Sequence, residues 1–258
     1  MPNDKMTQTT KPIKWYVKLA TRKGRQEAGA FLVEGSRAIG QIIASRPEAI
    51  IEVLTTDEVT PHPDYPHRQI TERQLRSIAT TQTPQGIIAV VRLPEIYDDR
   101  LPENPGDRIL LLEDVQDPGN VGTIIRTAAA FDFSGIIMTE NGADPFSPKC
   151  VQASAGTTLS LWLRRTSRYR ELTQALRQDG RPLIATDLTG DAKPDILRHH
   201  KRFILALGNE AAGLTPALCA AADYRLRLPT AARKAQSLNV AAAAAICMYL
   251  SAQNGTMA

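Results

Sequence analysis

Residues 108–138 read RILLLEDVQDPGNVGTIIRTAAAFDFSGIIM, and this stretch decides the fold. An apolar run at 108–114 is followed by a loop rich in Pro, Gly and Asn, a helical stretch at 121–131 and a second apolar run at 135–139. This order predicts a strand–loop–helix–strand unit. Because α/β proteins bind ligands beyond the carboxyl ends of such strands, we expect the polar groups of the loop to form part of a functional site.

The alternation of strands and helices continues to the end of the chain. Further strands are predicted at 182–186, 203–207 and 224–228. Further helices are predicted at 148–154, 168–178, 216–222 and 238–251, two of them started by the pairs Ser147-Pro148 and Thr215-Pro216. The pattern predicts an α/β domain with a parallel sheet covered on both faces.

Residues 1–93 predict a separate, smaller αβ domain. Strands are expected at 30–35, 49–55 and 86–93, with a helix at 36–44 and a second helix that Thr71 and Gln74 start as a capping box. Residues 94–107 carry three prolines, one glycine and five acids, and no apolar period crosses them. They are predicted to be a linker, so the larger domain spans 108–258.

The basic residues of the chain are clustered. The net charge is only +4 with a pI near 9.0, but seven basic residues and no acid lie between Lys5 and Arg25. Two smaller clusters occupy 164–170 and 198–202. A single cluster is typical of a solvated face, whereas three clusters together favour a nucleic-acid partner.

Several functional classes are disfavoured by what the chain lacks. Its three cysteines are too few and too scattered for a disulfide framework, and neither CxxC nor HExxH spacing is present. The longest apolar run, at 240–250, is too short to cross a bilayer, and the N-terminus has no signal-peptide core. We therefore expect no metal, no membrane segment and a reducing, cytoplasmic setting.

Two further loops carry polar groups at predicted strand ends. LGNEAAGL at 207–214 places Glu210 in an otherwise apolar segment, and its glycines let a ligand approach the main chain. LPTAARKAQSLNV at 228–240 leads into an Ala-rich helix and places Ser237 where the helix N-cap is expected. Arg126 lies between apolar helix neighbours, so it must meet a carboxylate, meet a phosphate or reach solvent.

Together, the stretches 110–138, 204–214 and 228–246 resemble the three motifs of the SpoU/TrmH family of RNA methyltransferases, in the SPOUT superfamily. The resemblance covers the whole second domain. The first domain resembles the ribosomal-protein-like substrate-binding extension of that family, through FLVEGSRAI at 31–39 and TPQGIIAVV at 83–91.

The resemblance implies transfer of methyl from S-adenosylmethionine to a ribose 2′-hydroxyl of ribosomal or transfer RNA, and the N-terminal domain favours ribosomal RNA while transfer RNA stays open. It also implies a trefoil knot at the carboxyl end and a homodimer. The residues that match the catalytic centre are Asn120, Arg126, Glu210, Ser237 and Asn239. Those that match the cofactor site are Leu207, Gly208, Asn209, Gly213, Leu228, Pro229 and Leu238. RNA contacts are expected from Lys18, Arg22, Lys23, Arg25, Glu34 and Arg37.

The family assigns activation of the hydroxyl to the arginine of motif one, here Arg126. Because a guanidinium holds its proton with a pKa above about 12, we expect Arg126 to orient a phosphate and polarise the hydroxyl. Glu210 is the second candidate for accepting the proton.

Motif three departs from the family pattern, because the segment between Pro229 and Ser237 is one residue longer and lacks a glycine. An RNA-binding protein that has lost the methyl donor is therefore an alternative. A base methyltransferase of the same superfamily is another. A dinucleotide oxidoreductase is disfavoured, because Gly119-Asn-Val-Gly122 is not GxGxxG.

Overall fold

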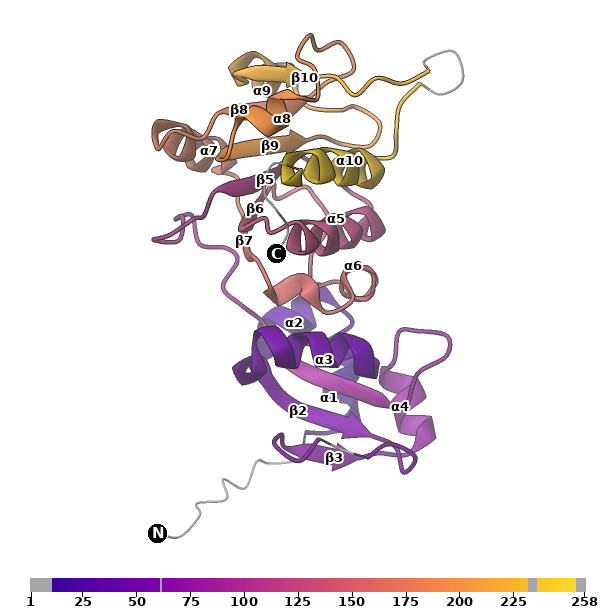
Figure 1. Cartoon of the computed structure of the whole chain (residues 1–258). Coiled ribbons are helices and arrows are strands. Elements are labelled where there is room, and N and C mark those ends of the chain that lie inside the picture. Colours follow the sequence, from indigo (N-terminus) through magenta and orange to yellow (C-terminus); the bar gives the residue numbers. More distant parts are fainter. Residues whose placement is uncertain (1–10, 61, 232–235, 254–258) are drawn as a thin grey trace.

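The computed structural model of the chain describes residues 11–60, 62–231 and 236–253. Two β-sheets, each with helices on both faces, are stacked end to end (Figure 1). The first sheet has the order β1-β4-β2-β3 and is mixed, with only β2 and β3 parallel. The second has the order β10-β8-β9-β5-β6-β7 and every pair in it is parallel. The predicted α/β class is confirmed.

The first sheet is built from the N-terminal third of the chain. Its elements are α1 (Ile13–Lys18), α2 (Arg22–Ala28), β1 (Ala30–Glu34), α3 (Ser36–Ser45), the 3-10 helix η1 (Pro47–Ala49), β2 (Ile50–Thr55), β3 (His67–Gln69), α4 (Glu72–Ile78) and β4 (Ile87–Arg92). The capping box of Thr71 and Gln74 forms as predicted. Helices α1 and α2 and strand β3 were not predicted, because basic and polar residues interrupt their apolar patterns.

The second sheet follows the predicted alternation. Its elements are β5 (Arg108–Leu112), α5 (Pro118–Ala130), β6 (Gly135–Met138), α6 (Pro148–Ser154), η2 (Thr157–Leu159), β7 (Trp162–Arg165), α7 (Tyr169–Gln178), β8 (Leu183–Thr186), α8 (Ile196–His199), β9 (Phe203–Leu207), α9 (Pro216–Ala221), β10 (Tyr224–Leu226) and α10 (Val240–Ala252). Strand β7 was missed because its sequence, WLRR, contains no apolar run. The Thr215 hydroxyl caps α9 as predicted, whereas the buried Ser147 hydroxyl makes no cap bond to α6.

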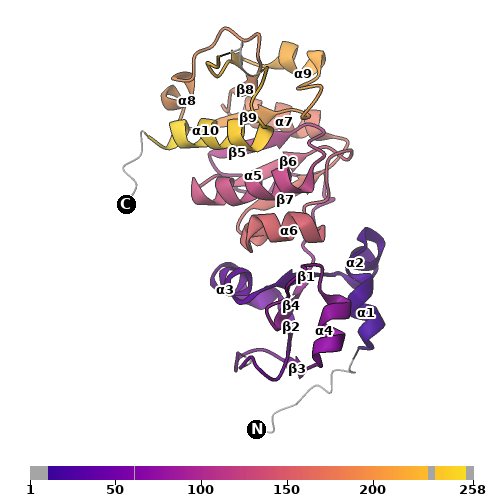
Figure 2. The same ribbon diagram turned by 90° about the vertical axis from the view of Figure 1, so that its right-hand side faces the viewer.

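The helices form two layers over the parallel sheet. One face packs against apolar side chains of α5, α6, α8 and α10, and the other against those of α7 and α9 (Figures 1 and 2). Strands such as β9, whose sequence FILAL is fully buried, are apolar throughout because both of their faces are covered.

The two sheets share one hydrophobic core. Phe31 of β1 packs on Phe146, just before α6, with ring centroids 4.9 Å apart. Gly156 abuts α3 so closely that a Cβ atom would come 2.3 Å from the carbonyl oxygen of Ala38. The guanidinium of Arg25 pairs with Asp144 at 2.5 Å, and the arginine is only 3% exposed. These contacts make the junction between the sheets a packed interface.

Residues 94–107 form no helix or strand, yet they are fastened to the second sheet. Ile96 is buried, and its carbonyl accepts a bond from the Arg165 amide. The indole of Trp162 donates to the carbonyl of Pro105, and Arg181 donates to that of Gly106. The segment 94–107, predicted to be a linker from its polar composition, therefore lies along the second sheet as a strap held by hydrogen bonds.

Candidate active site

Three loops meet at the carboxyl ends of the central strands, and Glu210 connects two of them. Its carboxylate accepts hydrogen bonds from the backbone N–H groups of Gln116 (3.1 Å) and Asp117 (3.0 Å). It also accepts one from the side-chain amide of Asn120 at 2.9 Å. Because β5 and β9 are parallel neighbours, the loop after each ends at the same edge of the sheet, which brings Glu210 to Asn120 across 90 residues of sequence.

Asn239 brings in the third loop. Its side-chain amide donates to the Asn120 side-chain oxygen at 3.0 Å. The side-chain oxygen of Asn239 accepts from the N–H groups of Ala241 and Ala242, so Asn239 is the N-cap of α10. The prediction that Ser237 occupies the cap was wrong, since α10 begins three residues later, at Val240. Asn120, Glu210 and Asn239 thus form one hydrogen-bonded cluster.

The loop after β9 is a tight turn held by Asn209. The N–H of Asn209 donates to the carbonyl of Gly213, and the reverse bond is also formed. Its side-chain amide donates to the carbonyl of Asp114 at 2.9 Å, and its side-chain oxygen accepts from the N–H groups of Ala211 and Ala212. Gly213 adopts φ +72°, and a Cβ on Gly208 would lie 2.2 Å from the Gly213 backbone. Both glycines are therefore required by the turn itself.

A cavity of about 280 Å³ opens beside this turn. The predicted cofactor residues that line it are Leu207, Gly208, Asn209, Gly213, Leu228 and Leu238, and Ser237 lines it too. Pro229 does not, although its neighbours Leu228 and Thr230 do. Thr186 at the end of β8, and Asp187 and Leu188 after it, also line the cavity and were not predicted. Their position at the end of the predicted strand 182–186 was the available signal.

The buried carboxylate of Glu113 is hydrogen-bonded to the residue that follows the turn. Glu113 is only 2% exposed and follows β5 directly. It accepts hydrogen bonds from the Tyr169 hydroxyl at 2.9 Å and from the N–H and hydroxyl of Thr215 at 2.7 and 2.9 Å. Thr215 caps α9, so this network ties the end of β5 to the exit of the turn. Sequence reasoning did not single out Glu113.

Opposing effects act on the pKa of Glu210. Partial burial raises it, but the hydrogen bonds from Asn120 and from the backbone of Gln116 and Asp117 outweigh burial, so the pKa lies below the usual glutamate range. Glu210 is therefore ionised at neutral pH. Three of its roughly four acceptor sites are already occupied.

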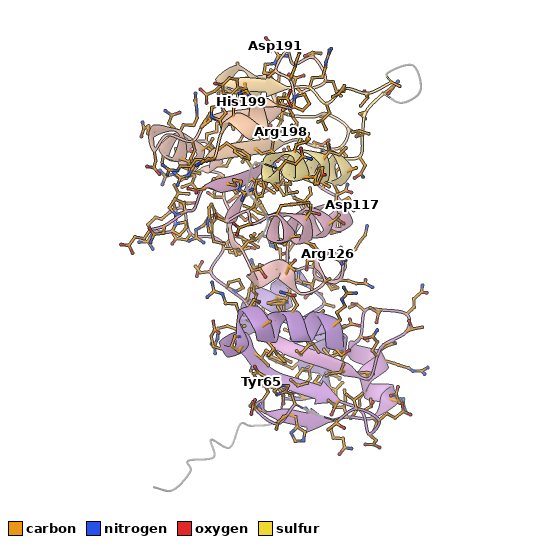
Figure 3. All side chains as sticks on the ribbon, in the orientation of Figure 1. Tyr65, Asp117, Arg126, Asp191, Arg198 and His199 are labelled. Atoms are coloured by element: carbon orange, nitrogen blue, oxygen red, sulfur yellow. The ribbon has the colours of Figure 1, made fainter. Side chains whose placement is uncertain are left out.

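Arg126 is exposed, so of the three alternatives that its apolar neighbours left open, it reaches solvent. It lies on α5 four residues after Gly122, which packs on α6, and Figure 3 shows it on the side of α5 toward α6. None of the described residues forms an ion pair or hydrogen bond with its guanidinium. Asp117, at the N-cap of the same helix, is instead paired with Lys149 at 2.7 Å.

The residues expected to contact RNA divide into two groups. Lys18, Arg22 and Lys23 are exposed on or beside α1 and α2. Arg25, in contrast, is buried at the domain junction, where its guanidinium donates to the carbonyls of Leu19 and Ala20 and pairs with Asp144. The prediction of an RNA contact from Arg25 is therefore contradicted by its burial.

Glu34 also has an internal role. Its carboxylate accepts hydrogen bonds from the N–H and hydroxyl groups of both Thr80 and Thr81. These four bonds use its acceptor capacity. Arg37, three residues on, is exposed.

The second predicted basic cluster is largely structural. Arg165 is 4% exposed and donates to the carbonyls of Glu140 and Gly142. Arg164 donates to the carbonyls of Arg100 and Glu95 in the 94–107 strap.

Among the described residues, no group of His, Cys, Asp and Glu side chains could hold a metal ion, and no helix is long and apolar enough to cross a membrane.

Family comparison supports the geometric analysis. The model of the SpoU rRNA Methylase family matches residues 107–249, and that of the MRM3-like substrate binding domain matches 11–89. The chain belongs to the SpoU rRNA methylase family. The SpoU match spans the three loops of the cluster and the residues that line the cavity.

Relatives in this family match nearly the whole chain. A 23S rRNA (guanosine(2553)-2′-O)-methyltransferase of Bacillus subtilis is 32% identical over 92% of this chain and 94% of its own length. A 23S rRNA (uridine(2479)-2′-O)-methyltransferase of Streptomyces viridochromogenes is 31% identical over 91% of this chain and 86% of its own. The crystal structure of the SpoU methyltransferase AviRb from Streptomyces viridochromogenes with AdoMet superposes with a TM-score of 0.81, at 27% identity, over 95% of this chain and 98% of that one.

Proposed function

We propose that this SpoU-family chain transfers methyl from S-adenosylmethionine to a ribose 2′-hydroxyl of ribosomal RNA. The observation that carries the proposal is the Asn120–Glu210–Asn239 cluster, whose Glu210 also lines a cavity formed by the loops after β8 and β9 and the segment that leads into α10. The two relatives that act on 23S ribosomal RNA match this chain over more than nine-tenths of its length, which favours ribosomal over transfer RNA as the substrate.

The cavity fits S-adenosylmethionine in chemistry. Leu207, Leu228 and Leu238 offer apolar walls for an adenine ring, and the turn around Gly208 presents main-chain groups to its edges. When bound, the cofactor supplies a methyl group on a positively charged sulfur. Asp187 also lines the cavity, where it accepts bonds from Thr189 and is ion-paired with Arg225.

Glu210, Arg126 and Ser237 are assigned different roles in the reaction. Glu210, ionised and already holding three donors, positions Asn120 and the two loops, which favours it as an anchor over a proton acceptor. Arg126 has an exposed guanidinium with no described partner. We assign it to the RNA phosphate beside the reacting ribose, where it orients and polarises the hydroxyl. Ser237 lines the cavity.

RNA is expected to lie along the exposed basic residues Lys18, Arg22 and Lys23 and to reach the cluster from there. Phosphate contacts of this kind position an RNA without reading its sequence. The three free cysteines suit the reducing, cytoplasmic setting in which the enzyme is expected to work.

A homodimer and a carboxyl-terminal knot belong to the same proposal. Helix α10 is almost wholly apolar, yet Ile246 and Tyr249 are 41% and 50% exposed on it. A second copy of the chain that packs on this face would bury both side chains. The knot, in the segment that leads into α10, remains a prediction, and Ala232, Arg233 and Lys234 of the altered motif three lie outside the described residues.

Transfer of labelled methyl to in-vitro-transcribed bacterial 23S ribosomal RNA tests the activity, followed by digestion to nucleosides and mass spectrometry. We expect one nucleoside to carry the label on its ribose. Label on a base would indicate the base methyltransferase alternative. An absence of label together with no heat of S-adenosylmethionine binding in calorimetry would support the RNA-binding protein that has lost its donor.

A further inference from the structure

A second cavity, of about 300 Å³, lies at the junction between the two sheets. Its walls come from both sides of the junction: the β1–α3 turn, the segment 80–85 before β4, and helix α6. It is separate from the cavity beside Gly208, with which it shares no lining residue. Its size is at the lower end of the range for small-ligand pockets, enough for one heterocyclic ring system.

The floor of the junction cavity is apolar and its shape is fixed. Leu19, Phe146 and Val151 line it, and each is buried. Glu34 holds the wall at Thr80 and Thr81 through its four hydrogen bonds. The neighbouring Arg25–Asp144 pair and the close approach of Gly156 to α3 hold the two sides together, so the pocket is formed before any ligand arrives.

Polar groups with free hydrogen-bonding capacity line the same cavity. Gln85 and Gln152 face it from opposite sides of the junction, and the described residues offer neither side-chain amide a hydrogen-bond partner. A primary amide donates and accepts in one plane, which is the pattern needed to pair with the edge of a base. Arg37 also lines the cavity and is exposed, so it adds a positive charge close to these amides.

The junction cavity lies on the same side of the molecule as the candidate active site. Lys149, between the cavity residues Pro148 and Val151, pairs with Asp117 at the N-cap of α5. In the shared orientation of Figures 1 and 3, Asp117 and the loop between α4 and β4 both lie on the right-hand side. One RNA strand is therefore able to pass both places.

We propose that the junction cavity holds one unstacked base of the substrate RNA, at a nucleotide other than the one that is methylated. Gln85 and Gln152 pair with the base edge, the apolar floor packs on the ring, and Arg37 binds the adjoining phosphate. Sequence-selective proteins read RNA in this way, at splayed bases of single-stranded segments. The inference rests on the proposed RNA substrate, and it makes both domains contribute to one specificity pocket.

Binding of fluorescein-labelled ten-nucleotide homopolymers of A, U and C, measured by fluorescence anisotropy, tests the proposal. The double variant Gln85→Ala/Gln152→Ala should weaken binding of one homopolymer by about tenfold, the usual scale of a lost base contact, and the others by less than about twofold. The control Gln41→Ala/Gln178→Ala removes two exposed glutamines outside the cavity and should change none of them. Equal weakening of all three, no weakening, or no binding by the wild-type chain would overturn the proposal.

Arg37 is tested separately because its contact is with phosphate. Arg37→Ala should weaken all three homopolymers alike and lower the salt dependence of binding by about one ion. Arg73→Ala, an equal loss of charge at an exposed position of α4 outside the cavity, should have a smaller effect. These assays need no methyl transfer, so they still decide the pocket if the enzymatic proposal fails. Capture of a peptide instead of RNA by the cavity would also overturn it.

Discussion

Arg25 and Arg126 lie in two regions that give a guanidinium opposite surroundings. At the domain junction, Arg25 is 3% exposed, pairs with Asp144 and donates to two carbonyls. On the α5 surface, Arg126 is exposed and the described chain offers it no partner. Arg25 is fully paired within one molecule, whereas Arg126 has no partner among the described residues. A charge that the described residues leave unpaired is available to a ligand.

The largest expected effect is the loss of catalysis in Arg126→Ala. Because Arg126 supports no contact within the described chain, its removal should leave thermal unfolding and S-adenosylmethionine affinity unchanged. Methyl transfer should fall about 1,000-fold, within the usual range for a group that assists proton transfer. Single-turnover transfer to 23S ribosomal RNA and calorimetry with the cofactor measure the two effects. Arg126→Lys keeps the charge but not the bidentate geometry, and should recover only a small part of the activity. Normal turnover by the alanine variant would remove Arg126 from the mechanism.

Arg25→Ala should show the reverse pattern. It leaves the Asp144 carboxylate, only 15% exposed, without its cation, and breaking a buried pair costs roughly 3 kcal/mol or more. We expect the free energy of unfolding in urea to fall by about that amount. Arg22→Ala, at an exposed position of the same helix, should change it by less than about 0.5 kcal/mol. Equal stability of the two variants would contradict the structural role assigned to Arg25.

The contrast between the two arginines marks the limit of what this sequence predicts. Strands such as β9 and the loops that carry Asn120 and Glu210 were predicted because burial on both faces and glycine-rich turns have strong local signals. Arg25 was misassigned because its partner Asp144 lies 119 residues away, and no local pattern encodes that pairing. The exposure of Arg126 was one of the alternatives left open by the sequence, and its neighbours Ile124 and Ile125 are in the core while Arg126 reaches solvent.

The site was predicted in its members more than in its connections. The sequence indicated Asn120, Glu210 and Asn239 but not that they bond to one another, nor that Glu113 binds Thr215 after the neighbouring turn. Those contacts depend on β5 and β9 becoming parallel neighbours, which is a property of the sheet order. Strand β7 was not predicted because its arginines donate hydrogen bonds to distant backbone carbonyls. The hydrogen bonds that hold residues 94–107 against the second sheet were not predicted either.

The apolar side chains of Ile246 and Tyr249 on α10 form a second surface that is exposed in one molecule. Ile246→Glu puts a charge at the centre of that apolar face without touching the core, since Ile246 is 41% exposed. If the face is a dimer interface, self-association measured by sedimentation velocity should weaken by at least about tenfold. Thr123→Glu, an exposed position on α5, adds the same charge as a control. A wild-type chain that sediments as a monomer would contradict the homodimer.

Glu210→Gln should have the smallest effect on stability, because Glu210 holds the two loops together but is only partly buried. Its folded pKa is lowered, so its contribution to stability is fully present above the ordinary glutamate pKa and is lost as pH falls through the folded value. The variant should therefore be less stable than the wild type by about 1 kcal/mol near neutral pH, a figure already reduced for solvent screening. The difference should shrink in acid, as urea unfolding across pH would show. If Glu210 were instead the proton acceptor, the variant would lose 100-fold or more in kcat at unchanged stability. A small kinetic loss that accompanies the stability loss would favour the anchor, leaving Arg126 as the group that meets the RNA.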